Sequence, residues 1–147
     1  MPPAYPFDCV VDASVLIKLF LPEQDSDLAT TLFILTSPAQ VIRVVPDLAY
    51  LECANIFRTR VHRGLLTSAE AGDLAAQLIM LPLAWYPTPP LLTAILDHAL
   101  TEQISAYDAA YVTLAEMLRL PLITADTVLA GKLQGTAVSV LDLASFR

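Results

Sequence analysis

Residues 7–20 read FDCVVDASVLIKLF, a short apolar run that ends in an acid and leads straight into a helical pattern. Phe7–Val11 has the composition of a strand buried on both faces, and Asp12 stands at its carboxyl end. The pattern that follows predicts a helix over Ser14–Phe20, which Pro22 stops. A strand followed by a helix is the repeating unit of an α/β fold.

The same order is repeated to the end of the chain. Further strands are predicted over residues 41–45, 83–86, 120–124 and 137–141, and further helices over 24–35, 46–63, 67–80, 91–100, 105–118 and 127–133. Alternation of this kind specifies a parallel sheet with helices on both faces. We therefore predict an α/β fold.

Several helix ends carry recognisable signals. Pro46 is expected in the first turn of the helix over 46–63, where the missing N–H group costs nothing, and Gly64 is expected to end that helix. Thr67 with Glu70 has the spacing of a capping box at the start of the next helix.

The totals bound the class of protein. With 147 residues, 56 % of them apolar, the chain is expected to form one domain over residues 1–147. No stretch reaches the roughly 20 apolar residues of a membrane helix, and the start lacks the features of a signal peptide. We therefore expect a cytoplasmic protein that does not span a membrane. Cys9 and Cys53 lack metal-binding spacing and are expected in the core.

Surface composition points to partners. The mean hydropathy of +0.60 is high for a small domain, so exposed apolar patches and an oligomer are expected. The net charge of −7 argues against a broad basic face for nucleic acid. Bound divalent ions would nevertheless offset the charge of a local acidic cluster and let it attract phosphate.

Four acids fall where a parallel sheet would gather them at one edge. Two of them follow predicted strands, one lies in the first turn of the helix before the fourth strand, and one lies on a helix among apolar neighbours: Asp12, Asp126, Asp108 and Glu52. Carboxylates a few ångströms apart raise one another's pKa, so such a cluster needs a cation to stay ionised. Because carboxylate oxygens suit Mg²⁺ or Mn²⁺ better than zinc, the sequence predicts a site for one of these ions.

Each acid also has a structural interpretation. Asp12 and Asp126 are placed to cap the helices that follow them, and Asp108 has the spacing of a capping box with Ser105. Glu52 is harder to explain in this way, because a Glu near a core needs a partner or a metal. The conjunction favours a site, because ligands bind where the carboxyl ends of parallel strands meet.

Four stretches of the chain resemble the acidic motifs of a known family. VVDASVLIKLF (10–20), ECANIF (52–57), SAYDAAYVTLAE (105–116) and LPLITAD (120–126) are similar, in this order, to the motifs of PIN domains. The likeness is strongest to the VapC-like ribonuclease toxins of prokaryotic toxin–antitoxin modules. It implies a three-layer α/β/α sandwich with a central, mostly parallel five-stranded sheet. It also implies Mg²⁺- or Mn²⁺-dependent cleavage of RNA, a homodimer and inhibition by a VapB-like antitoxin.

The resemblance also implies roles for individual residues. The metal-binding, catalytic acids are Asp12, Glu52, Asp108 and Asp126, with Ser14 and Thr124 as the hydroxyl residues beside them. We assign Asp12 and Asp108 to a main ion, and Glu52 and Asp126 to a second ion or to its water shell. Asn55 lies on the same polar stripe of its helix as Glu52 and is assigned a supporting role.

The substrate needs cations, and we predict that Lys18, Arg58, Arg60 and Arg63 bind it. The three arginines follow Glu52 on one helix, and Arg63, on the same stripe as Glu52, can touch a phosphate as the RNA chain leaves the metal. Alternatively, they favour the carboxyl end of their helix, or they meet an acidic segment of an antitoxin. Trp85 and Tyr86 are expected in the core.

Two other classes of protein compete with a nuclease. A phosphoacceptor domain of receiver type also places acids at strand ends, but it needs paired acids after the first strand, a lone Asp after the third and a Lys after the fifth. Asp8 and Asp12 are separated by the strand itself, and neither of the other two elements is present. The second class is a catalytically silent PIN-like scaffold that binds a partner, and the presence of all four acids argues against it.

Overall fold

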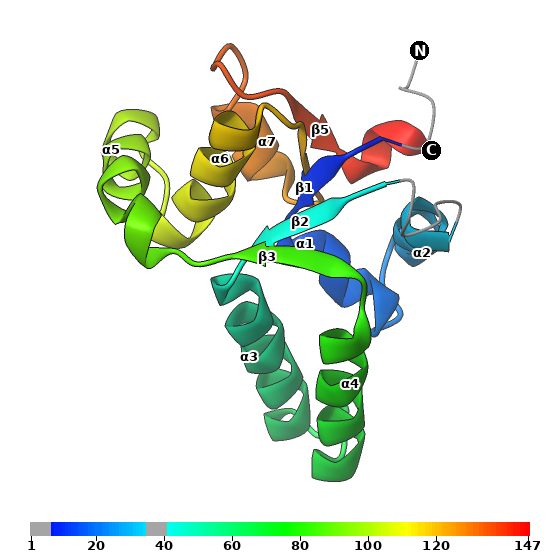
Figure 1. Cartoon of the computed structure of the whole chain (residues 1–147). Coiled ribbons are helices and arrows are strands. Elements are labelled where there is room, and N and C mark those ends of the chain that lie inside the picture. The colour runs from blue at the N-terminus through cyan, green and yellow to red at the C-terminus, as the bar shows by residue number, and fades with distance from the viewer. Residues whose placement is uncertain (1–6, 35–40) are drawn as a thin grey trace.

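A five-stranded parallel sheet forms the centre of the molecule (Figure 1). The computed structural model describes residues 7–34 and 41–147. The strands are β1 (Cys9–Val11), β2 (Arg43–Pro46), β3 (Leu83–Tyr86), β4 (Leu122–Thr124) and β5 (Val140–Asp142), in the order β3-β2-β1-β4-β5. Every adjacent pair is parallel, which confirms the predicted α/β class and the predicted number of strands.

Helices cover both faces of this sheet (Figure 1). On one side lie α1 (Ala13–Leu16) with the 3₁₀ turn η1 (Ile17–Leu19), α2 (Ser26–Ile34), α3 (Leu48–His62) and α4 (Ser68–Met80). On the other side lie η2 (Pro89–Leu91), α5 (Leu92–Glu102), α6 (Ala106–Leu118) and α7 (Thr127–Lys132), and η3 (Leu143–Phe146) follows β5. The side changes because the chain leaves the outer strand β3 and returns past β1 to form β4, and parallel crossovers keep one hand.

The core is continuous through the middle of the sheet. Every residue of β1 and β4 is buried, as is the stretch 109–115 of α6, which packs against β1, β2 and β4. Cys9 and Cys53 are buried free thiols, as predicted, and burial raises their pKa values to about 11 and about 12. The first strand is shorter than expected, because the regular pairing of its residues begins at Cys9.

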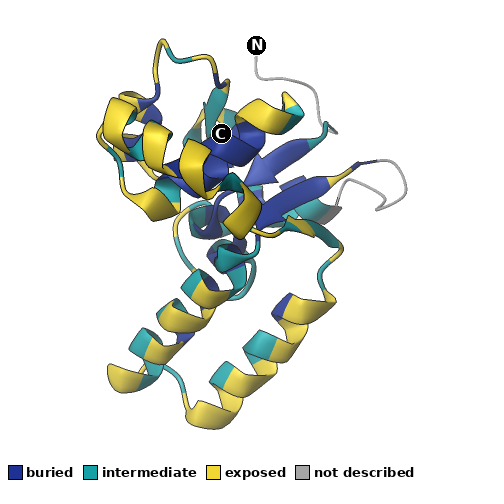
Figure 2. Ribbon diagram, turned by 60° about the vertical axis from the view of Figure 1, so that its left-hand side comes forward, coloured by how far each residue is buried: buried dark blue, intermediate teal, exposed yellow. Residues whose placement is uncertain are grey.

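Helices α3 and α4 form a hairpin that extends away from the sheet, with mostly exposed outer surfaces (Figure 2). Gly64 ends α3 as predicted, with a φ of +73° that a residue with a side chain rarely adopts. The capping box between Thr67 and Glu70 at the start of α4 is also confirmed. Within the described ranges, no helix is long and apolar enough to cross a bilayer.

Two local predictions are wrong. Pro46 is the last residue of β2, opposite Tyr86 in β3, and α3 begins only at Leu48. A proline can end a strand as readily as it opens a helix, because its fixed φ suits both places. Trp85 is 59 % exposed rather than buried, since it lies on the edge strand β3, and Tyr86 is partly buried against the core.

Candidate active site

The edge of the sheet where β1 and β4 end side by side determines where the acids lie. Val11 at the end of β1 is in register with Ile123 of β4, and the strand order reverses between these two strands. Asp12 therefore follows β1 at the same level as Thr124, the last residue of β4. This reversal point is where open α/β sheets bind their ligands.

Asp12 is held by two hydroxyl groups that converge on one of its oxygens. Ser14 Oγ donates to Asp12 Oδ2 at 2.6 Å, and Thr124 Oγ1 donates to the same atom at 2.9 Å. The backbone N–H groups of Ala125 and Asp126 donate to these two hydroxyl oxygens, each at 3.0 Å, and so direct the hydroxyl protons toward Asp12. Both hydroxyl residues named from the sequence therefore lie beside Asp12, and Oδ1 is left outside this hydroxyl network.

The helix-capping interpretations have different outcomes for different acids. Asp12 is the N-cap residue of α1, but its side chain makes no capping hydrogen bond, so that interpretation is wrong. Asp126 does cap α7, because its Oδ1 accepts from the N–H groups of Val128 and Leu129 at 3.0 Å each. Capping engages only Oδ1 of Asp126, which leaves Oδ2 for another ligand.

Glu52 and Asp108 approach the same edge from two helices. Glu52 lies in the second turn of α3, half-buried, and Oε1 accepts a hydrogen bond of 2.7 Å from the Tyr111 hydroxyl of α6. Asp108 lies in the first turn of α6, where its N–H group donates to the N-cap residue Ser105 at 3.0 Å. Tyr111 was not singled out in the sequence; the available signal was its position three residues after Asp108 on one helix.

The charges of the carboxyl groups raise the pKa values of neighbouring carboxyl groups. Burial raises the pKa of Asp12, with the charge of Asp108 adding to the rise and the hydroxyls of Ser14 and Thr124 opposing it. Burial likewise raises the pKa of Glu52, against the Tyr111 hydrogen bond, and the charges of Asp12 and Asp108 add to it. Burial also raises the pKa of Asp108, as does the charge of Asp126. These charge effects place Asp12, Glu52 and Asp108 near one another, and Asp126 near Asp108.

In the described part of the chain, a cation also acts on this group of acids. The charge of Lys132, the last residue of α7, opposes the rise in the pKa of Asp108. Its Nζ also donates to the carbonyl of Gln103, before the start of α6, at 3.4 Å. Lys132 was not assigned a role from the sequence, because its nearness to Asp108 arises from contact between α7 and the turn that precedes α6.

The donor set suits a hard divalent cation. It consists of carboxylate oxygens with neighbouring hydroxyls, the ligands that Mg²⁺ and Mn²⁺ prefer. Mutual repulsion and burial both raise the pKa values of three acids, and a cation would relieve both effects. Within residues 7–34 and 41–147, no three acidic, His or Cys side chains already stand in a metal-binding arrangement. The acids fit the ion in chemistry, and their side chains must turn toward one another to share it.

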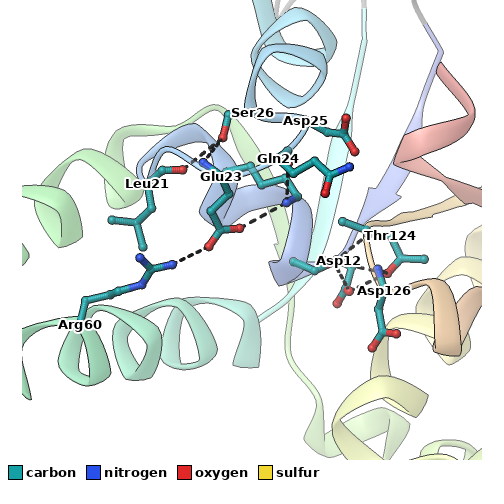
Figure 3. Close-up of polar contacts among 12 residues, drawn as sticks. Asp12, Leu21, Glu23, Gln24, Asp25, Ser26, Arg60, Thr124 and Asp126 are labelled. Carbon is teal, nitrogen blue, oxygen red and sulfur yellow. Dashed lines mark hydrogen bonds and ion pairs between the residues drawn. The ribbon is translucent and has the colours of Figure 1, made fainter. Parts of the chain in front are cut away.

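The predicted substrate-binding cations are less well organised. Lys18 Nζ donates to Glu23 Oε2 at 3.3 Å and to the carbonyl of Gln24 at 2.7 Å, and Arg60 Nη2 pairs with Glu23 Oε1 at 2.8 Å. Figure 3 shows Arg60 directed to Glu23, apart from Asp12, Thr124 and Asp126. Two of the predicted cations are therefore ion-paired to one acid.

The other residues named on α3 lie on its surface. Arg58 and Arg63 are exposed, the second at the end of the helix. Asn55 is exposed too, and its backbone carbonyl accepts from Thr59 Oγ1 at 3.0 Å.

A cavity of about 730 Å³ lies elsewhere in the molecule. Its lining includes Phe7, Pro121 and Ser139, which precede β1, β4 and β5, so it opens at the amino ends of these strands. None of the four acids lines it. This cavity and the acids thus lie at opposite edges of the sheet.

Comparison with known proteins agrees with this geometry. The family described as "PIN domain" matches residues 9–132. The chain is 36 % identical over 125 residues to "Ribonuclease VapC3" of Pyrobaculum aerophilum, a match that covers 84 % of this chain and 92 % of that protein.

Solved structures share the fold. PAE2754 from Pyrobaculum aerophilum superposes with a TM-score of 0.70 at 23 % identity, covering 95 % of this chain and 86 % of that one. A chain of a toxin–antitoxin complex from Klebsiella pneumoniae superposes with a TM-score of 0.62 at 14 % identity, covering 92 % of this chain and 97 % of that one. The three-layer arrangement expected from the sequence is therefore confirmed.

Proposed function

Because this chain belongs to the PIN domain family, we propose that it is a metal-dependent ribonuclease that hydrolyses RNA phosphodiester bonds as the toxin of a toxin–antitoxin pair. The observation that carries the proposal is the meeting of four acids from separate segments at the edge where β1 and β4 end. The identity of 36 % to a relative described as a ribonuclease supports the same activity.

In this proposal the ion is Mg²⁺ or Mn²⁺, held mainly by Asp12 and Asp108. Glu52 and Asp126 hold a second ion or the water shell of the first. When bound, such an ion supplies a water of lowered pKa and stabilises negative charge on the phosphorus oxygens. Ser14 and Thr124 fix the Asp12 carboxylate through Oδ2, so that Oδ1 faces the ligand in one orientation.

Cations around the acids bind the RNA backbone. Arg58 and Arg63 on the exposed side of α3 offer contacts to phosphates on one side of the site. On the other side, Lys132 lies beside Asp108. Lys18 and Arg60 act together with Glu23, so their contribution depends on whether RNA displaces that acid.

Two protein partners belong to the proposal. One is a VapB-like antitoxin, supported by the fold shared with a chain of a toxin–antitoxin complex. The other is a second copy of this chain. Leu92, Leu96 and Leu100 recur every four residues along α5 and are 56–72 % exposed, which supplies the apolar face that a homodimer needs.

The direct test is cleavage of RNA by the purified chain, free of any antitoxin. We expect cleavage with Mg²⁺ or Mn²⁺, none with EDTA, and none by Asp12→Asn. The matched control is Asp8→Asn at the opposite end of β1, where the Asp8 side chain accepts from the N–H group of Ile42 at 2.8 Å and an Asn oxygen can replace it. Undiminished cleavage by Asp12→Asn would contradict the proposal. If the protein without substitutions folds but does not cut RNA, the result favours the alternative of a catalytically silent scaffold that binds a partner.

A further inference from the structure

Tyr111 joins two of the acids through the core. It is fully buried and is the largest such side chain in the described part of the molecule. Its ring belongs to α6, and its hydroxyl donates to Glu52 Oε1 of α3 at 2.7 Å, across 59 positions of sequence. The ring that carries this hydroxyl lies in the stretch of α6 that packs against the sheet.

A tyrosine at this place must be explained by its hydroxyl group. A phenylalanine would fill the same volume without bringing a polar group into the core, where an unpaired hydroxyl costs free energy. The hydroxyl of Tyr111 avoids that cost by pairing with Glu52. What distinguishes tyrosine from phenylalanine here is therefore its bond to this carboxylate.

Glu52 needs such a partner more than the other acids do. Its carboxylate is separated from the backbone by two methylene groups, so more rotamers are open to it than to an aspartate. Asp12 is fixed by two hydroxyls and Asp126 by two backbone N–H groups. The bond from Tyr111 anchors Oε1 of Glu52 and leaves Oε2 available.

The helix that carries Tyr111 also carries Asp108, three residues earlier. One rigid element thus presents one acid to the site and orients another that comes from α3. We infer that Tyr111 is a positioning residue that holds Glu52 in the orientation needed to bind the metal, an inference that rests on the proposed function. Side chains of this kind, behind the ligands themselves, orient the ligands, and replacing one typically costs about 10- to 100-fold in metal affinity or activity.

The test is Tyr111→Phe, which keeps the ring and removes only the donor. We expect Mn²⁺ to bind about tenfold more weakly by calorimetry in the absence of RNA. In RNA cleavage, the Mn²⁺ concentration for half-maximal rate should rise by the same factor, while the rate at saturating Mn²⁺ stays close to that of the unchanged chain. Thermal unfolding checks that the variant folds.

Tyr107→Phe is the matched control. Tyr107 lies one turn earlier on the same helix and is 66 % exposed, so losing its hydroxyl should leave Mn²⁺ affinity unchanged. Glu52→Gln supplies the second comparison. If Tyr111 acts through Glu52, Tyr111→Phe should weaken Mn²⁺ binding in the unchanged chain but add nothing in the Glu52→Gln background.

The outcomes separate the two ideas. If the unchanged chain binds no Mn²⁺ and cuts no RNA, the proposed function fails and the inference fails with it. If the unchanged chain binds Mn²⁺ and Tyr111→Phe binds it equally well, only the positioning role is overturned. An equal loss in both backgrounds also overturns it, because the effect would then bypass Glu52.

Discussion

The edge of the sheet and the outer half of α3 are both polar, but they are built in opposite ways. At the edge, Asp12, Ser14 and Thr124 are short side chains next to strand ends, and backbone N–H groups direct the hydroxyls that bind Asp12. On α3, Arg60 reaches its partner Glu23 through a long side chain, and Arg58 and Arg63 extend into solvent. Backbone groups therefore hold the side chains at the edge of the sheet, whereas ion pairing between side chains determines the arrangement on α3.

This difference predicts how each region responds to change. A short side chain on a rigid strand end keeps its place only while its hydrogen bonds last, so removing one donor should disturb the chemistry strongly. A long cation on a helix surface can be replaced by a neighbour, and exposed ion pairs contribute about 1 kcal/mol or less. Substitutions at the edge should therefore have large effects, and those on α3 should have small ones.

After the loss of Asp12 itself, the largest expected effect comes from the hydroxyls around Asp12. The double variant Ser14→Ala, Thr124→Val should lower the rate of RNA cleavage about 100-fold at fixed metal concentration, because Asp12 loses both donors. The control is Thr59→Val, which removes a hydroxyl that bonds only within α3. Equal rates for the double variant and the control would contradict the prediction that substitutions at the edge have larger effects than those on α3.

The second prediction concerns stability without metal. The folded-state pKa of Asp12 is raised, so the folded chain binds this proton more tightly than the unfolded chain. Ionisation of Asp12 therefore lowers the free energy of unfolding. This destabilisation is complete at pH values above the folded-state pKa of Asp12, and it disappears as pH falls toward the ordinary carboxyl pKa of about 4. Asp12→Asn should raise Tm at pH 7.5, and should raise it less at each lower pH, in thermal scans with EDTA.

Asp25 supplies the control of opposite sign. A hydrogen bond and ion pair with Arg147 lower the pKa of Asp25, so its ionised form stabilises the fold above the ordinary carboxyl pKa. Asp25→Asn should slightly lower Tm at pH 7.5, and this loss should disappear as pH falls through the folded pKa. A lower Tm for Asp12→Asn at pH 7.5 would contradict the destabilising role of the buried carboxylate.

The third prediction tests the ion pairs of Glu23. Glu23→Gln removes the negative charge that pairs with Lys18 and Arg60, so both charges can act on phosphate, while Lys18 keeps its hydrogen bond to the carbonyl of Gln24. RNA binding to the inactive Asp12→Asn chain should tighten about fivefold, the size of one exposed ion pair. Fluorescence anisotropy with labelled RNA measures this affinity. Unchanged affinity would remove Lys18 and Arg60 from the set of substrate-binding residues.

The smallest effect is expected for a single exposed arginine. Arg63→Ala should weaken RNA binding about twofold at moderate salt and reduce the salt dependence by roughly one phosphate contact. Arg119→Ala is the matched control, because Arg119 lines the cavity at the opposite edge of the sheet. If both variants lose the same affinity, overall charge rather than the position of Arg63 explains the change.

Much of the candidate site could be predicted from sequence because parallel strands leave little freedom. Once the runs ending in Asp12 and Thr124 are strands of one sheet, their carboxyl ends must share an edge. Asp108 was also predictable, since Ser105 marks where its helix begins. The contacts of the arginines on α3 were less predictable, because helical spacing determines where their backbone lies but not where the ends of their long side chains lie.

The sequence by itself determined the alternation of strands and helices, the buried strand that precedes Asp12 and the set of acids, because periodicity and residue chemistry act locally. Tertiary structure decided which groups meet across the chain: Tyr111 with Glu52, Lys132 beside Asp108, and Glu23 between Lys18 and Arg60. Apart from Lys18 and Glu23, which are five residues apart, these groups come from elements separated in sequence. Their contacts depend on how the helices pack, which no local pattern encodes.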